Sequence, residues 1–286
     1  FTPLHPLIGA EVHGLSLRAP IAEKEGATLR EALRRFRLLL VRDQHEVSVD
    51  HQIAFTRVFG ELYVSRSYKG EMGDRGYYFS NTRADGQLGT GELAYHHDHL
   101  FLERPAHAAV LYAIEIPASG SGTKFRDAIE IFKRLPSDVQ ALARSVRCLH
   151  ALDYASVTRT GKVDKRALSS KALSAWQPLA WTDPDNRDTA LWLVPLTTVG
   201  FEGIDDEAGR ALLERLWHSA AGMTDLEYVH RWRAGDLVCW DNRRTVHRQV
   251  AFEEHFHELV QHGLEVGEAD ALVDEQPFDL VEHRRV

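Results

Sequence analysis

The stretch Tyr95-His96-His97-Asp98-His99-Leu100-Phe101 carries the pattern on which the interpretation of this chain depends. We expect the stretch to be extended, and successive side chains of a strand point to opposite faces of a sheet. His96 and Asp98 then share one face, while His97 and His99 share the other. An imidazole and a carboxylate on one face make two thirds of the 2-His-1-carboxylate triad, which holds non-heme Fe(II) and leaves coordination positions open. A third ligand is needed.

The triplet alone carries little weight. With 16 histidines in 286 residues, a His-x-Asp triplet arises about once by chance in a chain of this composition. A second stretch far downstream raises its significance. Residues 232–247 read Trp-Arg-Ala-Gly-Asp-Leu-Val-Cys-Trp-Asp-Asn-Arg-Arg-Thr-Val-His, so the stretch ends on His247.

The two stretches, Y-H-x-D-x-x-F and W-x-x-G-D-x-x-x-W-D-N-R-x-x-x-H, together resemble the signature blocks of the taurine dioxygenase-like (TauD/TfdA) family of Fe(II)/2-oxoglutarate-dependent oxygenases. The resemblance implies that His247 is the distal ligand, completing a metal site of His96, Asp98 and His247. It also implies a double-stranded β-helix, or jelly roll, with O₂ and 2-oxoglutarate as cosubstrates. Residues 6–12, 39–44 and 59–62 are similar to the family's opening segment, so the likeness extends to about Gly267.

Composition and charge restrict the class of protein. A chain of 286 residues at 44% hydrophobic content is sufficient for one large core, so we expect residues 1–286 to form a single domain. A net charge of −8 argues against a nucleic-acid or anionic-membrane partner, since both need a basic surface. Two cysteines cannot form a disulfide framework, which fits a cytoplasmic protein. No segment approaches the roughly 20 apolar residues of a membrane span.

Hydrophobic periodicity indicates many short strands and a few helices, which is typical of a mainly β fold with added helices (α+β), in a barrel or sandwich. Helices are expected at residues 28–37, 51–59, 127–133, 136–147 and 205–220, and strands at residues 38–41, 76–80, 108–114 and 256–266. Residues 228–233 and 236–240 are expected to pair as a hairpin across Ala234-Gly235. Residues 60–95 and 150–190 lack periodicity, and we expect them to be loops that cover an active site.

The resemblance also suggests residues that contact small molecules. Thr123 follows the Gly-rich turn 119–122 and loosely matches a family threonine that hydrogen-bonds the cosubstrate's distal carboxylate. Arg243 is a second candidate for cosubstrate binding. Tyr68, Asn81 and Tyr95 lie in or beside the region that forms the substrate roof in the family, although they are equally well explained as ordinary loop residues.

One expected feature is missing from the sequence. The family holds the distal carboxylate of 2-oxoglutarate with a bidentate arginine, and the corresponding position here is Glu258. A second family arginine, often used for an anionic substrate, corresponds to His262. A glutamate that faces a carboxylate would repel it. Three explanations are open: the strand register differs, another base such as Arg126, Arg243, Arg244 or Arg248 binds the carboxylate, or the enzyme does not use 2-oxoglutarate.

These observations leave three hypotheses for function. The first is an Fe(II)- and 2-oxoglutarate-dependent dioxygenase that hydroxylates or desaturates a small organic substrate. Because Asp98 is present, oxygenation is favoured over halogenation. The second is an Fe(II) oxygenase whose organic substrate binds the iron directly, with Glu258 and His262 near that substrate. The third is a non-catalytic metal-binding module. The family commonly forms homo-oligomers, so we expect one here.

Overall fold

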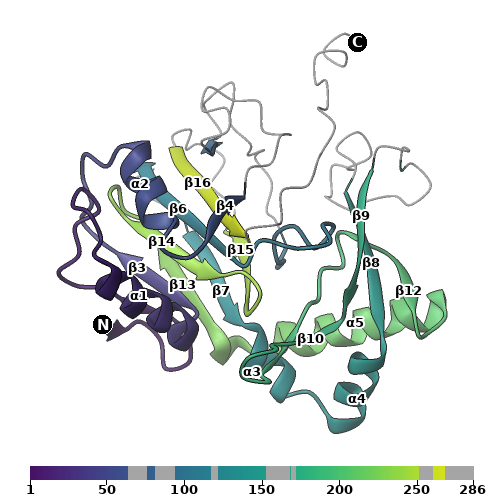
Figure 1. Cartoon of the computed structure of the whole chain (residues 1–286). Helices are drawn as coiled ribbons and strands as arrows, with labels where there is room; N and C mark the ends of the chain where they lie inside the picture. The colour runs from purple at the N-terminus through teal and green to yellow at the C-terminus, as the bar shows by residue number, and fades with distance from the viewer. Residues whose placement is uncertain are drawn as a thin grey trace.

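The structure is a computed structural model that describes residues 1–63, 76–80, 94–116, 122–152, 168, 172–250 and 260–267. Its largest element is an eight-stranded sheet (Figure 1). The strand order is β1-β2-β3-β14-β6-β16-β4, with β5 also paired to β16. The strands are β1 (Thr2–Pro3), β2 (Ala10–Glu11), β3 (Leu38–Val41), β4 (Glu61–Tyr63), β5 (Tyr77–Ser80), β6 (Ala108–Glu115), β14 (Leu237–Asp241) and β16 (Val260–Gly267).

A second sheet of three antiparallel strands faces the large one. It contains β13 (Glu227–Arg231), β7 (Gly122–Asp127) and β15 (Thr245–Gln249), with β7 in the centre. Phe125 of β7 packs in one apolar cluster with Leu38, Leu40 and Trp240 of the large sheet. Two facing, mainly antiparallel sheets around a shared core are the arrangement of a sandwich, so the expected mainly β jelly roll is confirmed.

Helices cover the other face of the large sheet (Figure 1). They are α1 (Glu23–Phe36) and α2 (Val49–Thr56). Alternation along β3 explains this layer, because Leu39 and Val41 pack in a cluster with the helices while Leu38 and Leu40 face the interior. The Ser48 hydroxyl accepts a hydrogen bond from the His51 N–H and so caps the start of α2. The helix and strand expected between residues 28 and 41 are therefore confirmed.

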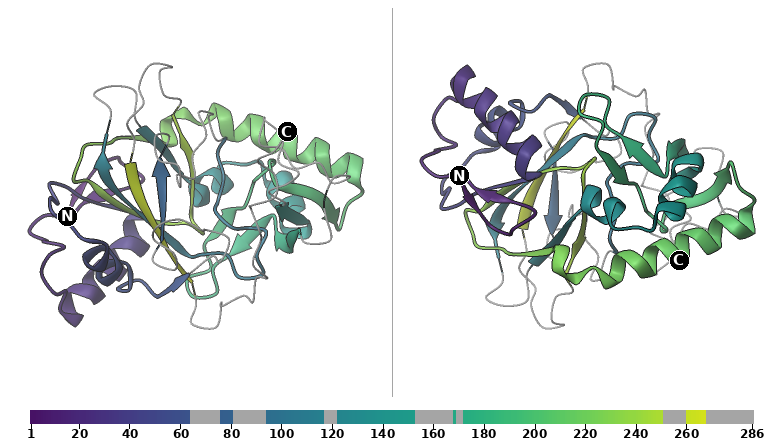
Figure 2. Two further views of the ribbon diagram at one scale, coloured as in Figure 1. Left: turned by 90° about the horizontal axis from the view of Figure 1, so that it is seen from above. Right: turned by 90° about the horizontal axis from the view of Figure 1, so that it is seen from below.

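The remaining elements form the opposite end of the molecule, where α5 runs along one edge (Figure 2). They are a sheet ordered β12-β8-β9, a β10-β11 pair, and the helices that pack on them. The bounds are β8 (Arg147–Leu152), β9 (Leu173–Pro178), β10 (Ala180–Thr182), β11 (Thr189–Leu191), β12 (Thr198–Glu202), α3 (Ala128–Lys133), α4 (Ser137–Ser145), α5 (Asp206–Gly222) and the 3-10 turn η3 (Thr224–Leu226). The expectation that residues 150–190 are all irregular is wrong, because β9 pairs with β8 along its length.

The predicted hairpin of residues 228–233 and 236–240 is also wrong. β13 pairs with β7 in the small sheet, whereas β14 pairs with β3 and β6 in the large sheet. The connection therefore crosses from one sheet to the other. It is held by Asp236, whose carboxylate accepts two hydrogen bonds from Arg42, and by Gly235, which takes a φ of 85°. A side chain at Gly235 would be strained at that φ.

The register of β16 is described against β6. His262 pairs with Tyr112, and Val266 pairs with Ala108. Tyr112, Ala108 and Val266 all belong to the cluster under α1 and α2, and paired residues of neighbouring strands share a face. Position 262 is thus paired with a residue of the helix-covered face, and because the side chain of His262 lies outside the described residues, its expected place near the substrate stays a prediction. The register shift between Val260 and Gln261 is the irregularity that the sequence pattern does not show.

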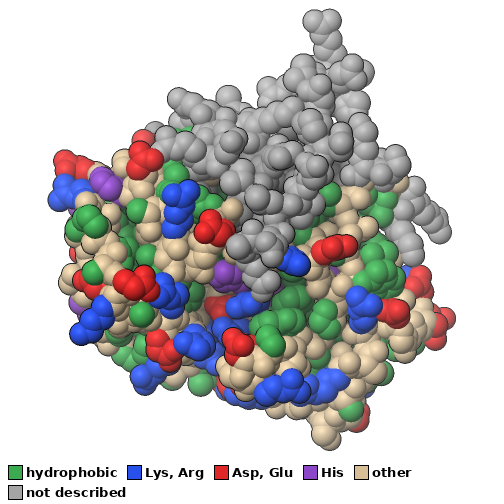
Figure 3. All heavy atoms as spheres, in the orientation of Figure 1, with side chains coloured by type: hydrophobic (Ala, Val, Ile, Leu, Met, Phe, Trp, Pro, Cys, Tyr) green, Lys and Arg blue, Asp and Glu red, His purple; other side chains and the backbone are tan. Residues whose placement is uncertain are grey.

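Two surface properties bear on possible partners. Within the part of the chain that the structure describes, no helix is long and apolar enough to cross a membrane. On the face drawn in Figure 3, basic and acidic side chains are interspersed.

Candidate metal centre

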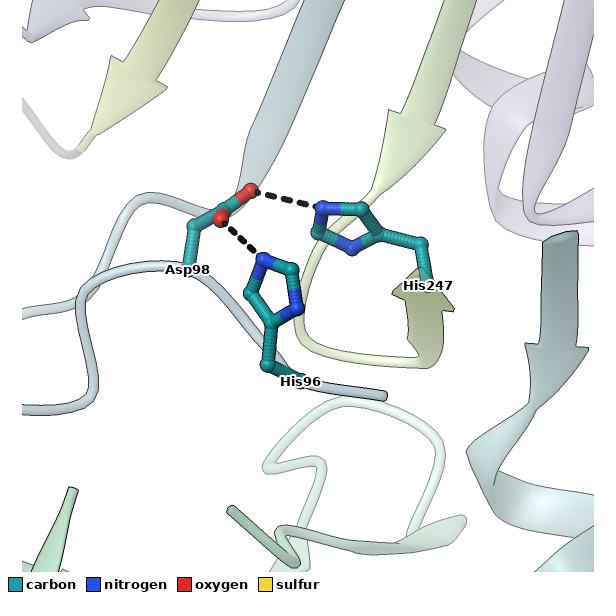
Figure 4. Close-up of side chains that lie close together, drawn as sticks. All are labelled: His96, Asp98 and His247. Carbon is teal, nitrogen blue, oxygen red and sulfur yellow. Dashed lines mark ion pairs between the residues drawn. The ribbon is translucent and has the colours of Figure 1, made fainter. Parts of the chain in front are cut away.

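Three side chains converge between the two sheets: His96, Asp98 and His247 (Figure 4). Their potential ligand atoms all lie within 4.8 Å of one another. The Nε2 atom of His96 is 3.3 Å from Asp98 Oδ1, and the Nε2 atom of His247 is 3.5 Å from Asp98 Oδ2. The structure thus brings together the three residues that the sequence predicts. Two imidazoles and one carboxylate are the donor set of non-heme Fe(II) sites, so these residues fit that metal.

His247 is positioned by the small sheet. It pairs with Phe125 of β7 and exchanges two backbone hydrogen bonds of 3.0 Å with His96. Its ring lies between aromatic neighbours, with centroids 6.1 Å from Phe125 and 4.9 Å from Trp240. These side chains keep the His247 ring in an apolar environment and fix its orientation.

The His96 and Asp98 segment differs from the extended strand that we expected. It forms only an isolated bridge at His96 and then turns from Asp98 onward, with His99 at a φ of 60°. Asn242 holds this turn, because its Oδ1 accepts from the Asp98 N–H (2.8 Å) and its Nδ2 donates to the Asp98 carbonyl (3.0 Å). The same amide donates to the Ala106 carbonyl at 2.8 Å. Asn242 therefore positions the carboxylate of Asp98.

The electrostatics of Asp98 and His247 favour metal binding. Burial raises the pKa of Asp98, but His247 and His96 outweigh it and hold that pKa well below its usual range. Burial lowers the pKa of His247 to about 3, so its imidazole is neutral near pH 7. Nδ1 of His96 lies 2.8 Å from the Ala94 carbonyl, which lets Nδ1 donate and leaves the Nε2 lone pair for a ligand bond. A neutral imidazole and an ionised carboxylate are the forms that bind metals.

The neighbouring histidine points elsewhere. His97 is buried, and its ring nitrogens lie 2.7 Å from the Asn242 carbonyl and 3.1 Å from the Leu191 carbonyl. Among the described residues, the group that could hold a metal includes neither His97 nor His99. That both are dispensable for metal binding remains a prediction.

The two residues predicted to bind a cosubstrate lie in different places. Thr123 is in β7, on the same face as Phe125, and its hydroxyl oxygen accepts a hydrogen bond from Trp232 Nε1 at 2.9 Å. It therefore faces the interior with its own proton available to donate. The guanidinium of Arg243 instead lies over the Trp181 ring, 5.3 Å from the centroid. The structure does not bring Arg243 to the triad.

The other arginines proposed as substitutes for the missing family arginine are also directed elsewhere. Arg126 and Arg248 alternate with Phe125 and His247 along their strands, so they lie on the opposite face of the small sheet. Arg244 is buried in ion pairs with Asp183 and Asp241. Within the described chain, none of these arginines lies on the face that carries His247.

The predicted substrate residues are only partly covered. Tyr68, Asn81 and Glu258 lie outside the described residues, and for His262 only the strand position is described. The hydroxyl of Tyr95 donates to Glu227 Oε2 at 2.5 Å, on the outer face of the small sheet, so Tyr95 does not join the triad. These assignments therefore stay predictions.

Sequence reasoning missed the roles of Asn242, Phe125 and Trp240. Asn242 and Trp240 belong to the second signature stretch, which was used only to find His247. Asn242 contacts Asp98 from 144 positions away, and nothing in the local pattern indicates that contact. The alternation of β7 places Phe125 on the inner face once the position of Thr123 is known.

Comparison with known proteins places the chain in a family. Residues 1–262 match the family "Taurine catabolism dioxygenase TauD, TfdA family". The chain is 31% identical to an alpha-ketoglutarate-dependent 2,4-dichlorophenoxyacetate dioxygenase of Cupriavidus pinatubonensis, over 86% of this chain and 90% of that protein. It is 27% identical to pentalenolactone F synthase of Streptomyces arenae, over 86% and 88%.

A solved structure supports the fold. The crystal structure of a putative alpha-ketoglutarate-dependent taurine dioxygenase from Burkholderia xenovorans superposes with a TM-score of 0.76 at 23% identity, covering 93% of this chain and 88% of that one. At that identity the likeness shows the fold alone. The family match over most of the length, together with the relative at 31% identity, shows that this chain belongs to the TauD/TfdA dioxygenase family.

Proposed function

We propose that this protein is an Fe(II)- and 2-oxoglutarate-dependent dioxygenase that oxidises a small organic molecule. The observation that carries the proposal is the convergence of His96, Asp98 and His247 within 4.8 Å, in a chain of the TauD/TfdA family. The relatives described above are dioxygenases or synthases named for small organic compounds. We further propose that residues 1–286 form one domain and that the protein is a cytoplasmic homo-oligomer.

The residues of the chain would contribute as follows. His96, Asp98 and His247 hold the metal through three positions and leave the others open. When bound, ferrous iron supplies the redox chemistry that couples O₂ reduction to decarboxylation of 2-oxoglutarate and oxidation of the substrate. Asn242 fixes the Asp98 turn, and Phe125 and Trp240 exclude water around His247. Because Asp98 is a carboxylate, oxygenation is the outcome that we propose.

The hydroxyl of Thr123 is the described group best placed to donate to the distal carboxylate of 2-oxoglutarate. It lies on the inner face of the small sheet, two positions along β7 from the partner of His247. We propose that the remaining contacts to 2-oxoglutarate and substrate come from residues near Tyr68, Asn81 and Glu258.

The test is oxygen uptake by the Fe(II)-loaded protein, with a panel of small organic acids that includes 2,4-dichlorophenoxyacetate. We expect uptake to require 2-oxoglutarate, with one succinate formed for each O₂ consumed. The His247→Ala variant is the control and should show neither. Oxygen uptake that does not depend on 2-oxoglutarate would favour an oxygenase whose substrate binds the iron directly. Stoichiometric Fe(II) binding with no uptake for any compound would favour a non-catalytic module.

A further inference from the structure

A pocket lies on the side of the small sheet away from the metal centre. We call it the outer pocket, and its volume is about 330 Å³, at the lower end of the range for small-molecule sites. Its floor comes from β7 and β15, and α5 closes one side. Val246 and Arg248 flank His247 in sequence, so their side chains reach this pocket from the face opposite to the His247 ring. It is lined by Tyr95, Lys124, Arg126, Ile131, Leu191, Leu193, Trp217, Ala220, Ala221, Thr224, Glu227, Val246 and Arg248.

The polar part of the outer pocket is a cluster around Glu227. Lys124 Nζ lies 2.7 Å from Glu227 Oε1, and Arg126 Nη2 lies 2.8 Å from Oε2. Tyr95 donates to the same carboxylate, and its ring lies under Arg126 at 4.7 Å and Arg248 at 5.5 Å. Both oxygens of Glu227 are therefore already engaged.

Positive charge exceeds negative charge in this lining. The lining contains Lys124, Arg126 and Arg248, and Glu227 is the one acidic side chain among the described residues that line it. Arg126 is 5% exposed, and its Nε atom has no hydrogen-bond partner within the described chain. A buried guanidinium with a donor left over is stabilised by an added anion.

The rest of the lining is apolar and extends away from the charges. Ile131 comes from α3, Leu191 and Leu193 from the segment around β11, and Trp217 from α5. Aromatic and aliphatic walls with a few convergent polar groups are the usual composition of a small-molecule site. A ligand that fits this lining has an apolar body and one anionic end.

We infer that the outer pocket binds a small amphipathic monoanion, a carboxylate or sulfonate with an aromatic or aliphatic body. The anionic group lies against Lys124, Arg126 and Arg248, and the body lies against Trp217 and the leucines. This places Tyr95 in contact with a small-molecule ligand at a site separated from the metal by the small sheet. The ligand contacts Val246 and Arg248 on either side of His247, so it occupies the reverse side of a metal-ligating strand.

The test uses three probes of the same shape: 2-naphthoate, naphthalene-2-sulfonate and the neutral 2-naphthylmethanol. Calorimetric titration of the full chain should show that one or both anions bind with a stoichiometry of one, at least about tenfold tighter than the alcohol, since one charged contact contributes about that factor. The comparison of the two anions tells which anionic group the site prefers. Arg248→Gln should weaken binding of the two anions by about tenfold and leave the affinity for the alcohol unchanged.

A matched pair of variants separates the pocket from the rest of α5. Ala221 and Ala211 are both exposed alanines of α5, but only Ala221 lines the pocket. Ala221→Leu should fill the pocket and weaken binding of all three probes by about tenfold or more. Ala211→Leu should leave all three affinities unchanged.

Competition with the metal centre is the second control. Saturating Mn(II) and 2-oxoglutarate should leave 2-naphthoate binding unchanged, because the two sites lie on opposite faces of the sheet. Displacement by that pair would place the probe in the metal centre and overturn the inference. Equal affinity in Ala221→Leu and the unaltered protein, or no binding at millimolar concentration, would also overturn it. None of these outcomes depends on turnover, so the proposed oxygenase function is tested separately.

Discussion

The two faces of the small sheet carry opposite kinds of chemistry on the same three strands. The inner face presents Thr123, Phe125 and His247, which are uncharged near neutral pH and packed against the large sheet. The outer face presents Lys124 and Arg126 from β7 and Arg248 from β15, around the carboxylate of Glu227. Strand alternation alone separates them, since each outer residue is the sequence neighbour of an inner one.

The difference shows how one backbone supports two electrostatic environments. On the inner face, burial lowers the pKa of His247 to about 3 and keeps its imidazole available as a ligand. On the outer face, burial raises the pKa of Glu227, but hydrogen bonds from Lys124, Tyr95 and Arg126 outweigh it and lower that pKa to about 2. Because neighbouring residues of a strand point to opposite faces, a substitution at one position should affect only the chemistry of its own face.

The largest expected effect is loss of the metal in His247→Ala. Removing one of three protein ligands should weaken Mn(II) or Fe(II) binding by about a hundredfold or more, which corresponds to about 3 kcal/mol. Calorimetric titration with Mn(II) measures the change. Val246→Ala is the outer-face control and should keep metal stoichiometry and affinity. Full metal occupancy in His247→Ala, or loss of metal in Val246→Ala, would contradict the division between the two faces.

The second prediction concerns His97, which lies between the metal ligands His96 and Asp98 in sequence. His97→Ala should lower the free energy of unfolding by about 2 kcal/mol, because it removes a buried ring that lies within hydrogen-bond distance of two carbonyls. Metal stoichiometry should be unchanged. Urea unfolding and Mn(II) titration test the two parts. A variant that keeps its stability but loses the metal would show that the ligand assignment is off by one residue.

Much of the fold was predictable because local patterns determine it. The helix that becomes α1 and the strands β3 and β6 follow from hydrophobic spacing within each segment. The supposed hairpin at residues 228–240 could not be recognised as a crossing between sheets. Polar and apolar residues alternate along its two strands as they would in a hairpin. The contact that holds the crossing is between Arg42 and Asp236, which are 194 positions apart.

The metal site shows the same limit. His96, Asp98 and His247 were predicted from two motif blocks, and the structure brings them together. The turn at Asp98 was not predicted, because the Asn242 amide that holds it acts from a distant segment.

The third prediction tests the inner face for cosubstrate binding. Thr123→Val removes the hydroxyl and should weaken 2-oxoglutarate binding by about tenfold, the effect of one hydrogen bond to a charged group. Thr123→Ser keeps the hydroxyl and should restore the affinity. Lys124→Gln, one residue away on the outer face, should leave 2-oxoglutarate affinity unchanged. Anaerobic titration of the Fe(II) protein, followed by metal-to-ligand charge-transfer absorption, gives the three dissociation constants.

The smallest expected effect lies on the outer face and depends on pH. The pKa of Glu227 is about 2 in the folded protein, against 4.5 as its ordinary value. A carboxyl group whose pKa falls on folding stabilises the protein above its unfolded pKa, and that contribution is lost as pH falls through the folded value. Glu227→Gln should therefore lower the free energy of unfolding by about 1 kcal/mol at pH 7.

The difference between Glu227→Gln and the unaltered protein should shrink as pH falls below 4.5 toward 2. Urea unfolding at pH 7, 5, 4 and 3 measures it, provided that the dependence on urea concentration is unchanged. Glu214→Gln, an exposed carboxylate on α5, is the control and should give almost no difference at any pH. If the Glu227→Gln difference stays constant down to pH 3, the cations of the outer face do not stabilise this carboxylate. Packing, and not ion pairing with Glu227, would then determine the positions of Lys124 and Arg126. The charge of the outer pocket would have no measurable effect on stability.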